Sequence, residues 1–353
     1  MPKKKVETLY GPIEVDRWVY QSSKGGRLYV PMDDGARLLQ NGTPRFIKVL
    51  GWKYGQMSGE GVEEDLAANH GRQVSSHYIQ KAFSALGDVM RECEMEWTYN
   101  LPNYKLDEVH SISLGRDGTT THIRGEGYKE SMAGTITLYG KESNRLTTIY
   151  LGCAPEKGKE TFDLLFLREI QIVKNRYPNI PYIGLADGAP DNWTVLHPQT
   201  DVQILDFFHA AEYVKKYCDA RGNNRKRQKT FEELRHTLRH DEGGASTILE
   251  MMNTSLGQVK KQSQKEKIQT SVTYFENHLH QMDYCAYSKL GYSIGSGVTE
   301  AACKTLVKER LSKSGMRWTR GGVDDILMAR GLILSNRWDI FWGKVDRQNY
   351  YRA

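Results

Sequence analysis

The stretch V-H-S-I-S-L-G-R-D-G-T, residues 109–119, decides the fold of this chain because it alternates apolar and polar residues before it reaches an acid. Alternation of this kind is typical of a β-strand with one buried face. Outward from it, S-M-A-G-T-I-T-L-Y-G (131–140) and R-L-T-T-I-Y-L-G (145–152) predict two further strands. Because the three segments follow one another closely, we expect hairpins to join them into an antiparallel sheet.

A regular alternation of helix and strand comes next. Residues 158–177 place apolar side chains at helical spacing, and Pro178 ends that helix. I-P-Y-I-G-L-A-D (180–187) predicts a buried strand, a short helix follows, and D-V-Q-I-L-D (201–206) predicts a fifth strand. Right-handed crossovers then make a mixed sheet covered by helices on both faces. We therefore predict an α/β protein with a ribonuclease H-like mixed sheet of order βββαβαβα.

The first 43 residues predict a small β-hairpin region. V-D-R-W-V-Y (15–20) and R-L-Y-V-P (27–31) flank the turn former Lys24-Gly25-Gly26. Residues 44–90 change to a helical pattern, in which Gly71 separates two helices.

The two helices around Gly71 predict a helix-turn-helix over residues 44–90. The second helix, 76–86, is expected to be capped at Ser75 or Ser76 and to be able to enter a DNA major groove. A packed helical hairpin without DNA contacts is an equal alternative, because the motif is short and degenerate.

The rest of the chain divides by composition. We expect a linker at 91–108, a ribonuclease H-like core at 109–217 and 291–353, and an all-helical insertion at 218–290, where strand signals are few.

Two aspartates occupy matching places in the predicted sheet. Asp117 lies on the first strand and Asp187 at the carboxyl end of the fourth, and each is followed by a glycine. Neighbouring strands are about 4.8 Å apart, so the two carboxylates are expected to share a metal ion. A plain D-G turn is the simpler interpretation of either one, and the repetition of the pattern at Gly118 and Gly188 weighs against it.

Two glutamates compete to be the third acid. Glu300 opens a helix after Gly295-Ser296-Gly297, whereas Glu309 lies nine residues on and would face the opposite side of a straight helix. We predict that Glu300 faces the aspartates and that Glu309 forms a surface ion pair. A carboxylate that merely favours the helix dipole is the alternative for Glu300.

Asp206 and His209 are three residues apart where the fifth strand meets a helix. Side chains at this spacing are neighbours, so the two are expected to pair with each other or with a phosphate. A helix cap and a core histidine are the alternative.

Basic residues gather in two runs. Residues 215–240 hold nine Lys/Arg against three acids, and residues 304–320 hold six against Glu309 alone. Solvated helix faces explain either run alone, but two runs flanking a carboxylate site favour a polyanion. For Trp318 we favour a helix anchor over a base-stacking platform. The predicted DNA-binding set is Arg225, Lys226, Arg227, Lys304, Lys308, Arg317, Arg320 and Trp318.

The composition excludes several classes of protein. The 353 residues carry a net charge of +6, and 39% of them are hydrophobic, enough to bury a core. Five isolated cysteines without a C-x-x-C pair support neither structural zinc nor a disulfide framework. No apolar run reaches membrane-spanning length and no secretion signal follows M-P-K-K-K, so a cytoplasmic, nucleoid-associated protein is expected.

Several longer blocks resemble those of a known family. They are D-G-T (117–119), L-A-D-G-A (185–189), I-L-D-F-F-H-A-A-E-Y-V (204–214), I-G-S-G-V-T-E-A-A-C-K (294–304) and R-L-S-K-S-G-M-R-W (310–318). Together they resemble the bacterial insertion-sequence DDE transposases of the ISKra type, which are distantly Mutator-like. The resemblance extends over residues 110–340 and is weaker over 60–90.

The resemblance implies catalytic and metal-binding acids at Asp117, Asp187 and Glu300, and an accessory pair at Asp206 and His209. Many of these transposases carry an N-terminal C-x-x-C zinc ribbon, whereas no cysteine precedes Cys93 here, so we expect a hairpin without zinc. The intact acids argue against an inactive, domesticated copy.

The resemblance and the acids together predict a DNA transposase that cleaves element ends and joins them to target DNA. Two Mg²⁺ or Mn²⁺ ions, about 3.5–4 Å apart, would serve phosphoryl transfer, double-stranded DNA is the expected partner, and the family implies a homodimer or higher oligomer on DNA. The alternatives are a ribonuclease H-like nuclease that does not join strands and an inactive DNA-binding regulator derived from a transposase.

Overall fold

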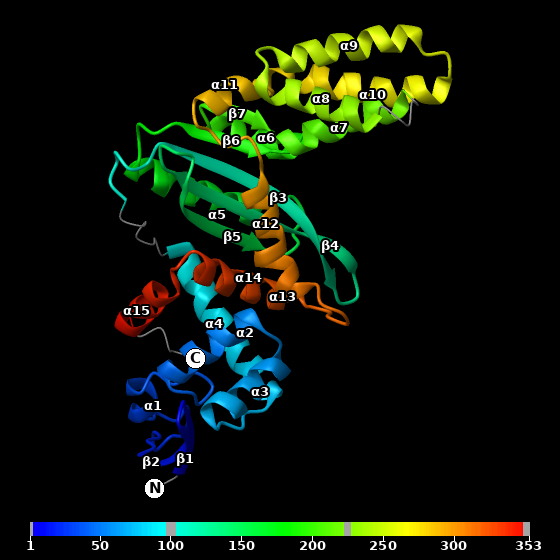
Figure 1. The fold of residues 1–353 in the computed structure, drawn as a ribbon. Helices are drawn as coiled ribbons and strands as arrows, with labels where there is room; N and C mark the ends of the chain where they lie inside the picture. Colours follow the sequence, from blue (N-terminus) through cyan, green and yellow to red (C-terminus); the bar gives the residue numbers. More distant parts are fainter. Residues whose placement is uncertain (1–2, 97–103, 222–226, 349–353) are drawn as a thin grey trace.

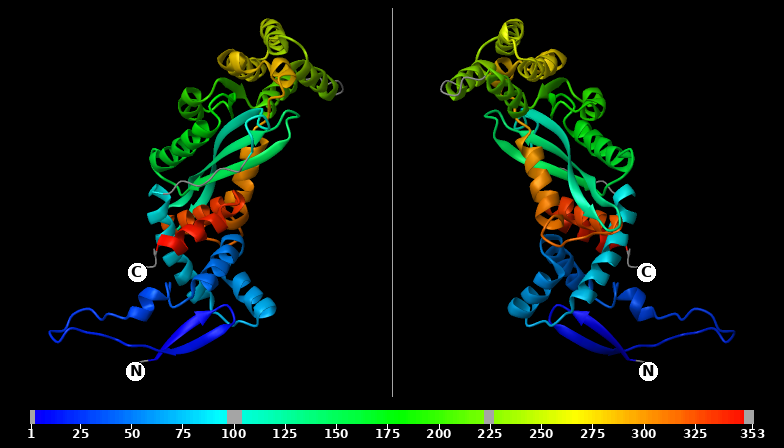
Figure 2. Two further views of the ribbon diagram at one scale, coloured as in Figure 1. Left: turned by 90° about the vertical axis from the view of Figure 1, so that its left-hand side faces the viewer. Right: turned by 90° about the vertical axis from the view of Figure 1, so that its right-hand side faces the viewer.

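A computed structural model of the chain describes residues 3–96, 104–221 and 227–348. The molecule is elongated: an N-terminal ribbon and a group of helices form one end, a sheet occupies the middle, and a helical layer forms the other end (Figures 1 and 2). None of the helices within those ranges is long and apolar enough to span a membrane.

A five-stranded mixed sheet forms the centre of the molecule. Its strands are β3 (Ser111–Ile123), β4 (Gly127–Tyr139), β5 (Arg145–Cys153), β6 (Tyr182–Ala186) and β7 (Val202–Leu205), in the spatial order β5-β4-β3-β6-β7. β3, β4 and β5 pair antiparallel, whereas β6 and β7 run parallel to β3. The predicted strands and their order are therefore confirmed.

Helices cover both faces of this sheet. On one face, α5 (Glu160–Arg176) packs its apolar stripe against β3, β4 and β5, and its last residue lies two positions before Pro178, as predicted. The other face is covered by α12 (Gly297–Ala302), the π-helical segment η3 (Cys303–Lys308), α13 (Glu309–Leu311) and α14 (Arg320–Leu334). α6 (Pro190–Leu196) and a short 3₁₀ turn, His197–Gln199, connect β6 to β7.

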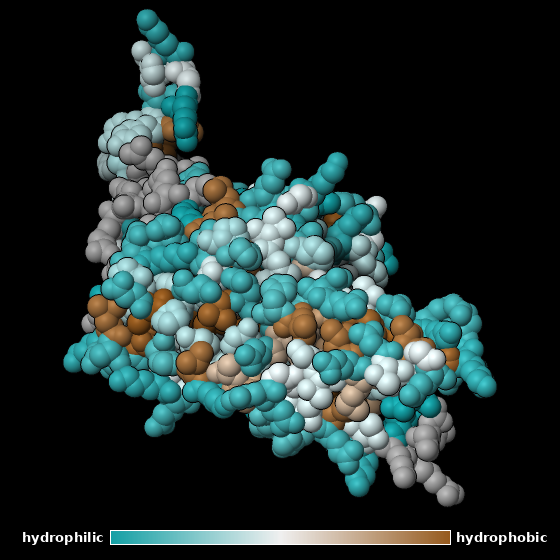
Figure 3. Space-filling model, turned by 90° about the horizontal axis from the view of Figure 1, so that it is seen from above, coloured by the Kyte–Doolittle hydropathy of each residue, from teal (hydrophilic) through white to brown (hydrophobic). Residues whose placement is uncertain are grey.

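The predicted insertion is helical throughout its described part. α7 (Phe207–Ala220) leads into α8 (Arg227–His240), α9 (Gly244–Gln258), α10 (Gln262–His278), a 3₁₀ turn at Leu279–Gln281 and α11 (Tyr284–Lys289). These helices share a buried apolar cluster with β6 and β7, so they extend the core rather than form a separate unit. Seen from their end of the molecule, the surface is mostly hydrophilic with scattered hydrophobic side chains (Figure 3).

The N-terminal hairpin differs from its prediction. The paired strands are β1 (Lys3–Thr8) and β2 (Gly11–Asp16), upstream of the predicted pair. Around Lys24-Gly25-Gly26 the structure has only one isolated bridge between Tyr20 and Tyr29. Most side chains of residues 17–29 are exposed, so a second pair of strands there would have no apolar face to bury. α1 (Pro31–Gly35) ends the segment.

The expected helix pair around Gly71 is present. α2 (Pro44–Gln56) precedes α3 (Gly59–His70), which ends at Gly71 in the left-handed conformation (φ +59°), and the Ser75 hydroxyl accepts the Tyr78 N–H at the start of the next helix. That helix, α4 (Ser76–Glu96), runs ten residues beyond the predicted end and into the expected linker at 91–108; residues 97–103 lie outside the described ranges.

The helix pair is not a separate module. α2, α3 and α4 bury their apolar faces in one cluster with α12, η3, α14 and α15 (Trp338–Gln348). The exposed face of α4 near its start carries His77, Gln80, Lys81 and Ser84. The predicted domain boundary at residue 90 therefore does not lie between two separate hydrophobic cores.

Candidate metal-binding active site

The two aspartates lie on or directly after neighbouring strands. β3 pairs with β6 over three residues, from Ile112 beside Tyr182 to Leu114 beside Gly184, and Asp117 and Asp187 each follow three residues after the last pair. Asp187 directly follows the last residue of β6, as predicted. Asp117 lies in the middle of β3, which continues to Ile123, so the D-G pair at 117 is not a strand end.

The helix that carries Glu300 lies close against the sheet. The hydroxyls of Thr299 on α12 and Thr135 on β4 share a hydrogen bond of 2.7 Å. A Cβ atom on Gly115 of β3 would come within 2.0 Å of the Thr299 Oγ1, so the absence of a side chain at Gly115 permits this contact. Glu300, the next residue, accepts a 3.0 Å hydrogen bond from the Ser296 hydroxyl, and its charge acts on Asp117.

The environment of Asp117 combines burial, acidic neighbours and hydrogen-bond donors. Partial burial raises the pKa of Asp117, and the negative charges of Asp187 and Glu300 raise it further, against hydrogen bonds from Cys303 and Gly118 that lower it. The Cys303 thiol donates to Oδ2 at 3.3 Å, and the Gly118 N–H donates to Oδ1 at 2.7 Å. Within the described ranges no basic side chain forms an ion pair with Asp117 or Asp187.

Asp187 is oriented by the chain that follows it. Its Oδ1 accepts the Ala189 N–H at 3.0 Å and the Asn192 side-chain amide at 2.9 Å. Oriented carboxylates with no cationic partner are the donor set that Mg²⁺ and Mn²⁺ prefer, so the residues present fit a divalent ion.

The predicted accessory residues, Asp206 and His209, lie in different environments. Asp206 is fully buried, and its two oxygens accept the N–H groups of His209 and Ser296, so it caps α7 and fixes the loop before Glu300. His209 is not a core histidine: its Nε2 lies 4.0 Å from Glu300 Oε1. Ligand atoms of Asp206, His209 and Glu300 lie within 4.8 Å of one another, and the described part of the chain holds no such tight group made of Asp117, Asp187 and Glu300.

Three residues near the acids were not singled out by the sequence. Cys303 follows Glu300 by one helical turn. If the I-G-S-G-V-T-E-A-A-C-K block is taken as a helix, this spacing predicts that the two side chains lie on the same face. Tyr274 and His278 belong to α10, and a Cβ atom on Gly188 would come within 2.8 Å of the Tyr274 ring and 3.1 Å of the His278 ring. Burial raises the pKa of the Tyr274 phenol, and the Asp187 charge adds to this effect. No sequence pattern links Tyr274 or His278 to Asp187, because they are far apart in the chain.

The competing acid Glu309 lies away from the site. It is exposed, and it pairs at 3.5 Å with the buried Arg330 rather than with another surface residue as predicted. The premise of a straight α-helix is wrong, because η3 is π-helical and changes the turn angle between Glu300 and Glu309.

The predicted DNA-binding residues fall into different environments. Lys304, Lys308 and Arg317 are exposed. Arg320 pairs with Glu126, and Arg227 with Asp219 at 3.1 Å. Arg225 and Lys226 lie outside the described residues.

Trp318 is an anchor, as favoured from the sequence. Its indole N–H donates to the Leu311 carbonyl at 3.0 Å, and the Arg310 guanidinium lies 4.8 Å from its ring. A base-stacking role for this ring is therefore dropped.

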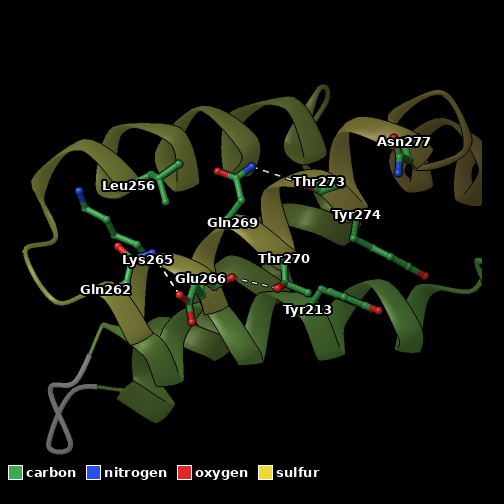
Figure 4. A pocket seen from close by; sticks show the side chains of 10 residues that line it. All are labelled: Tyr213, Leu256, Gln262, Lys265, Glu266, Gln269, Thr270, Thr273, Tyr274 and Asn277. Atoms are coloured by element: carbon green, nitrogen blue, oxygen red, sulfur yellow. Dashed lines mark hydrogen bonds between the residues drawn. The ribbon is translucent and has the colours of Figure 1, made fainter.

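An open pocket of about 850 Å³ lies on the helical insertion, beside α10. Amide and hydroxyl side chains of α10 line it, with Leu256 from α9 and Tyr213 from α7 (Figure 4). Tyr213 stacks on Tyr274 with ring centroids 3.6 Å apart, so this wall of the pocket is also the boundary towards Asp187.

Comparison with known proteins gives distant similarities. No family model matches the chain. It is 22% identical, over 365 aligned positions, to UPF0236 proteins of Caldanaerobacter subterraneus subsp. tengcongensis, covering 98% of this chain and 72% of one such protein and 68% of another. A solved structure, the Drosophila P element transposase strand transfer complex, aligns with a TM-score of 0.30 and 9% identity over 87% of this chain and 81% of that one. The chain is thus similar throughout to bacterial UPF0236 proteins.

Proposed function

We propose that this protein is a DDE-type DNA transposase, a polynucleotidyl transferase with a ribonuclease H-like core, of the ISKra type that its sequence blocks resemble. The observation that supports the proposal is that the pKa of Asp117, raised by burial, is raised further by the charges of Asp187 and Glu300, so all three acids lie within electrostatic range. Asp187 also directly follows β6, the strand that pairs with the strand of Asp117. Such carboxylates suit divalent ions and phosphoryl transfer.

Each acid would have a defined part in the site. Asp117, Asp187 and Glu300 would hold Mg²⁺ or Mn²⁺, which supply Lewis-acid stabilisation of the phosphoryl oxygens when bound. Asn192 and the Ala189 N–H orient Asp187, and Ser296 orients Glu300. His209, 4.0 Å from Glu300, is placed to hydrogen-bond a phosphate oxygen or exchange a proton there.

The test is a strand-transfer assay with Mg²⁺ or Mn²⁺ on DNA that carries the sequences flanking this gene. Cleavage with joining supports a transposase. Cleavage without joining would leave a nuclease, and binding without cleavage would leave a regulator.

The variant Asp187→Asn tests the site itself. Asparagine keeps the shape of the side chain but removes the charge that a metal requires, so cleavage should fall by at least about 10²-fold, comparable to the loss of one preorganised electrostatic contact, while DNA binding is retained. Asp191→Asn is the matched control. Asp191 lies nearby in the chain, but its side chain is 76% exposed, and its Oδ2 lies 3.7 Å from the Nζ of Lys159. Full activity in Asp187→Asn would overturn the assignment.

A further inference from the structure

A polar groove of about 750 Å³ separates the N-terminal helices from the lower end of the sheet. One wall is formed by the starts of α3 and α4, and the other by the loop between α13 and α14 together with the turn between β3 and β4. In Figure 1 these elements meet where α2, α3 and α4 lie below α13 and α14. Side chains from both walls line it, among them Ser76, Gln80, Ser84, Arg124, Arg317 and Thr319.

The two walls are fixed to each other by a buried arginine. Arg310 is 1% exposed, and its guanidinium lies between the rings of Tyr54 and Trp318, 4.8 Å from each centroid. Its Nε donates to the Tyr54 carbonyl at 2.9 Å. Since Tyr54 belongs to α2 and Trp318 to the core loop, the groove is preformed.

The groove is suited to an anion. Arg124 and Arg317 are exposed, and in the part of the chain that the structure describes neither forms an ion pair. The acid on the opposite side, Asp325, is already paired with Arg91. Glu60 also lines the groove, but the arginines outnumber the acids.

Three helices add to this positive potential because they begin at the groove. α3 starts after Ser58, α4 at Ser76 and α14 after Thr319, and all three positions line it. Helix starts carry a partial positive charge and free N–H groups. Gly321 and Gly322 leave room for a close approach.

We infer that this groove binds the phosphate backbone of duplex DNA, so that one duplex contacts the start of α4 and the core loop at the same time. Only the choice of DNA as the anion rests on the proposed function. From Arg317, the exposed side chains of Lys308 and Lys304 follow η3 back towards Glu300. A duplex in the groove would thus be guided from the helix pair to the acids.

The experiment compares two double variants by fluorescence anisotropy on a labelled 40-bp mixed-sequence duplex over a salt series. Arg124→Gln/Arg317→Gln removes two phosphate contacts, so the slope of log Kobs against log[salt] should become shallower by about 2. Lys260→Gln/Lys261→Gln removes the same charge from the exposed turn between α9 and α10 and should leave the slope unchanged. Thermal melting confirms that both variants are folded.

Each other outcome has a definite meaning. A wild-type slope in the groove variant, or equal changes in both variants, overturns the groove assignment. A change in molecular mass by light scattering in the groove variant would identify a contact between copies instead and also overturns it. If DNA binding depends on the groove arginines but the protein does not cleave DNA, the groove assignment is supported and the transposase proposal is contradicted. If the protein cleaves DNA and the groove variant cleaves it equally well, the transposase proposal is supported and the groove assignment is contradicted.

Discussion

At the scale of single residues, small side chains decide where the acids lie. Gly115 lets α12 approach β3, and Gly188 leaves space that the Tyr274 and His278 rings border. Burial and two acidic neighbours raise the pKa of Asp117, and the hydrogen bonds from Cys303 and Gly118 offset this only in part. Because no basic side chain among the described residues pairs with it, a bound cation would favour its ionised form.

Comparison of Glu300→Gln with Glu309→Gln tests the choice of the third acid. Glu300→Gln should lower cleavage by at least about 10²-fold, because it removes a ligand charge at the site. Glu309→Gln removes the charge of an exposed side chain that pairs with Arg330 outside the site, so cleavage should stay near the wild-type rate. The assay is single-turnover DNA cleavage with Mn²⁺, and equal losses in the two variants would contradict the assignment.

At the scale of elements, the contact between α4 and α14 holds a buried acid. Asp325 of α14 is 4% exposed, and a Cβ atom on Gly87 of α4 would come within 2.1 Å of its carboxylate oxygen. Burial raises the pKa of Asp325 to about 6, against the opposing effect of its partner Arg91. Asp325 therefore holds its proton to a higher pH in the folded state than in the unfolded state.

This raised pKa predicts a pH dependence of stability. The folded-state pKa of about 6 exceeds the ordinary value of 3.8, so the wild-type protein loses unfolding free energy as the pH rises through that window. Asp325→Asn lacks this titration, so its unfolding free energy relative to wild type should rise by up to about 3 kcal/mol between pH 4 and 7.

Urea unfolding at several pH values measures this difference. Asp339→Asn is the control, because Asp339 is 85% exposed. Parallel pH profiles for the wild type and Asp325→Asn would contradict the prediction.

At the scale of the whole molecule, buried arginines join the N-terminal helices to the core. Arg330 of α14 is 2% exposed and donates to the carbonyls of Leu306 and Gly55, each at 2.8 Å. Its Nη2 also donates to the Thr305 carbonyl. These contacts connect α2, η3 and α14 through one side chain.

The variant Arg330→Met tests this connection. It leaves buried carbonyl groups without a donor, which should cost about 3 kcal/mol or more of unfolding free energy. Arg145→Met, at an exposed position at the start of β5, should change stability by less than about 0.5 kcal/mol. Urea unfolding followed by circular dichroism and tryptophan fluorescence distinguishes the two, and equal stabilities would refute the role of Arg330.

Local pattern was enough to predict the sheet. Four segments each determine a strand: the alternating segments 109–119, 131–140 and 145–152, and the apolar run before Asp187. Burial of one face of a strand requires alternation, and burial of both faces requires a continuous apolar run. The turn at Gly71 and the cap at Ser75 were likewise predictable, since both depend on backbone groups within a few residues.

Long-range contacts decided the rest. The sequence by itself determined the strands and their order along the chain, because these follow from residue type and spacing, and it singled out Asp117, Asp187 and Glu300 as candidates. Only the tertiary structure decided that Asp206 clamps the loop before Glu300, that Tyr274 and His278 border Asp187, and that the helix pair shares the core. The reason is physical: burial, charge coupling and closing of a groove depend on packing between segments far apart in the chain.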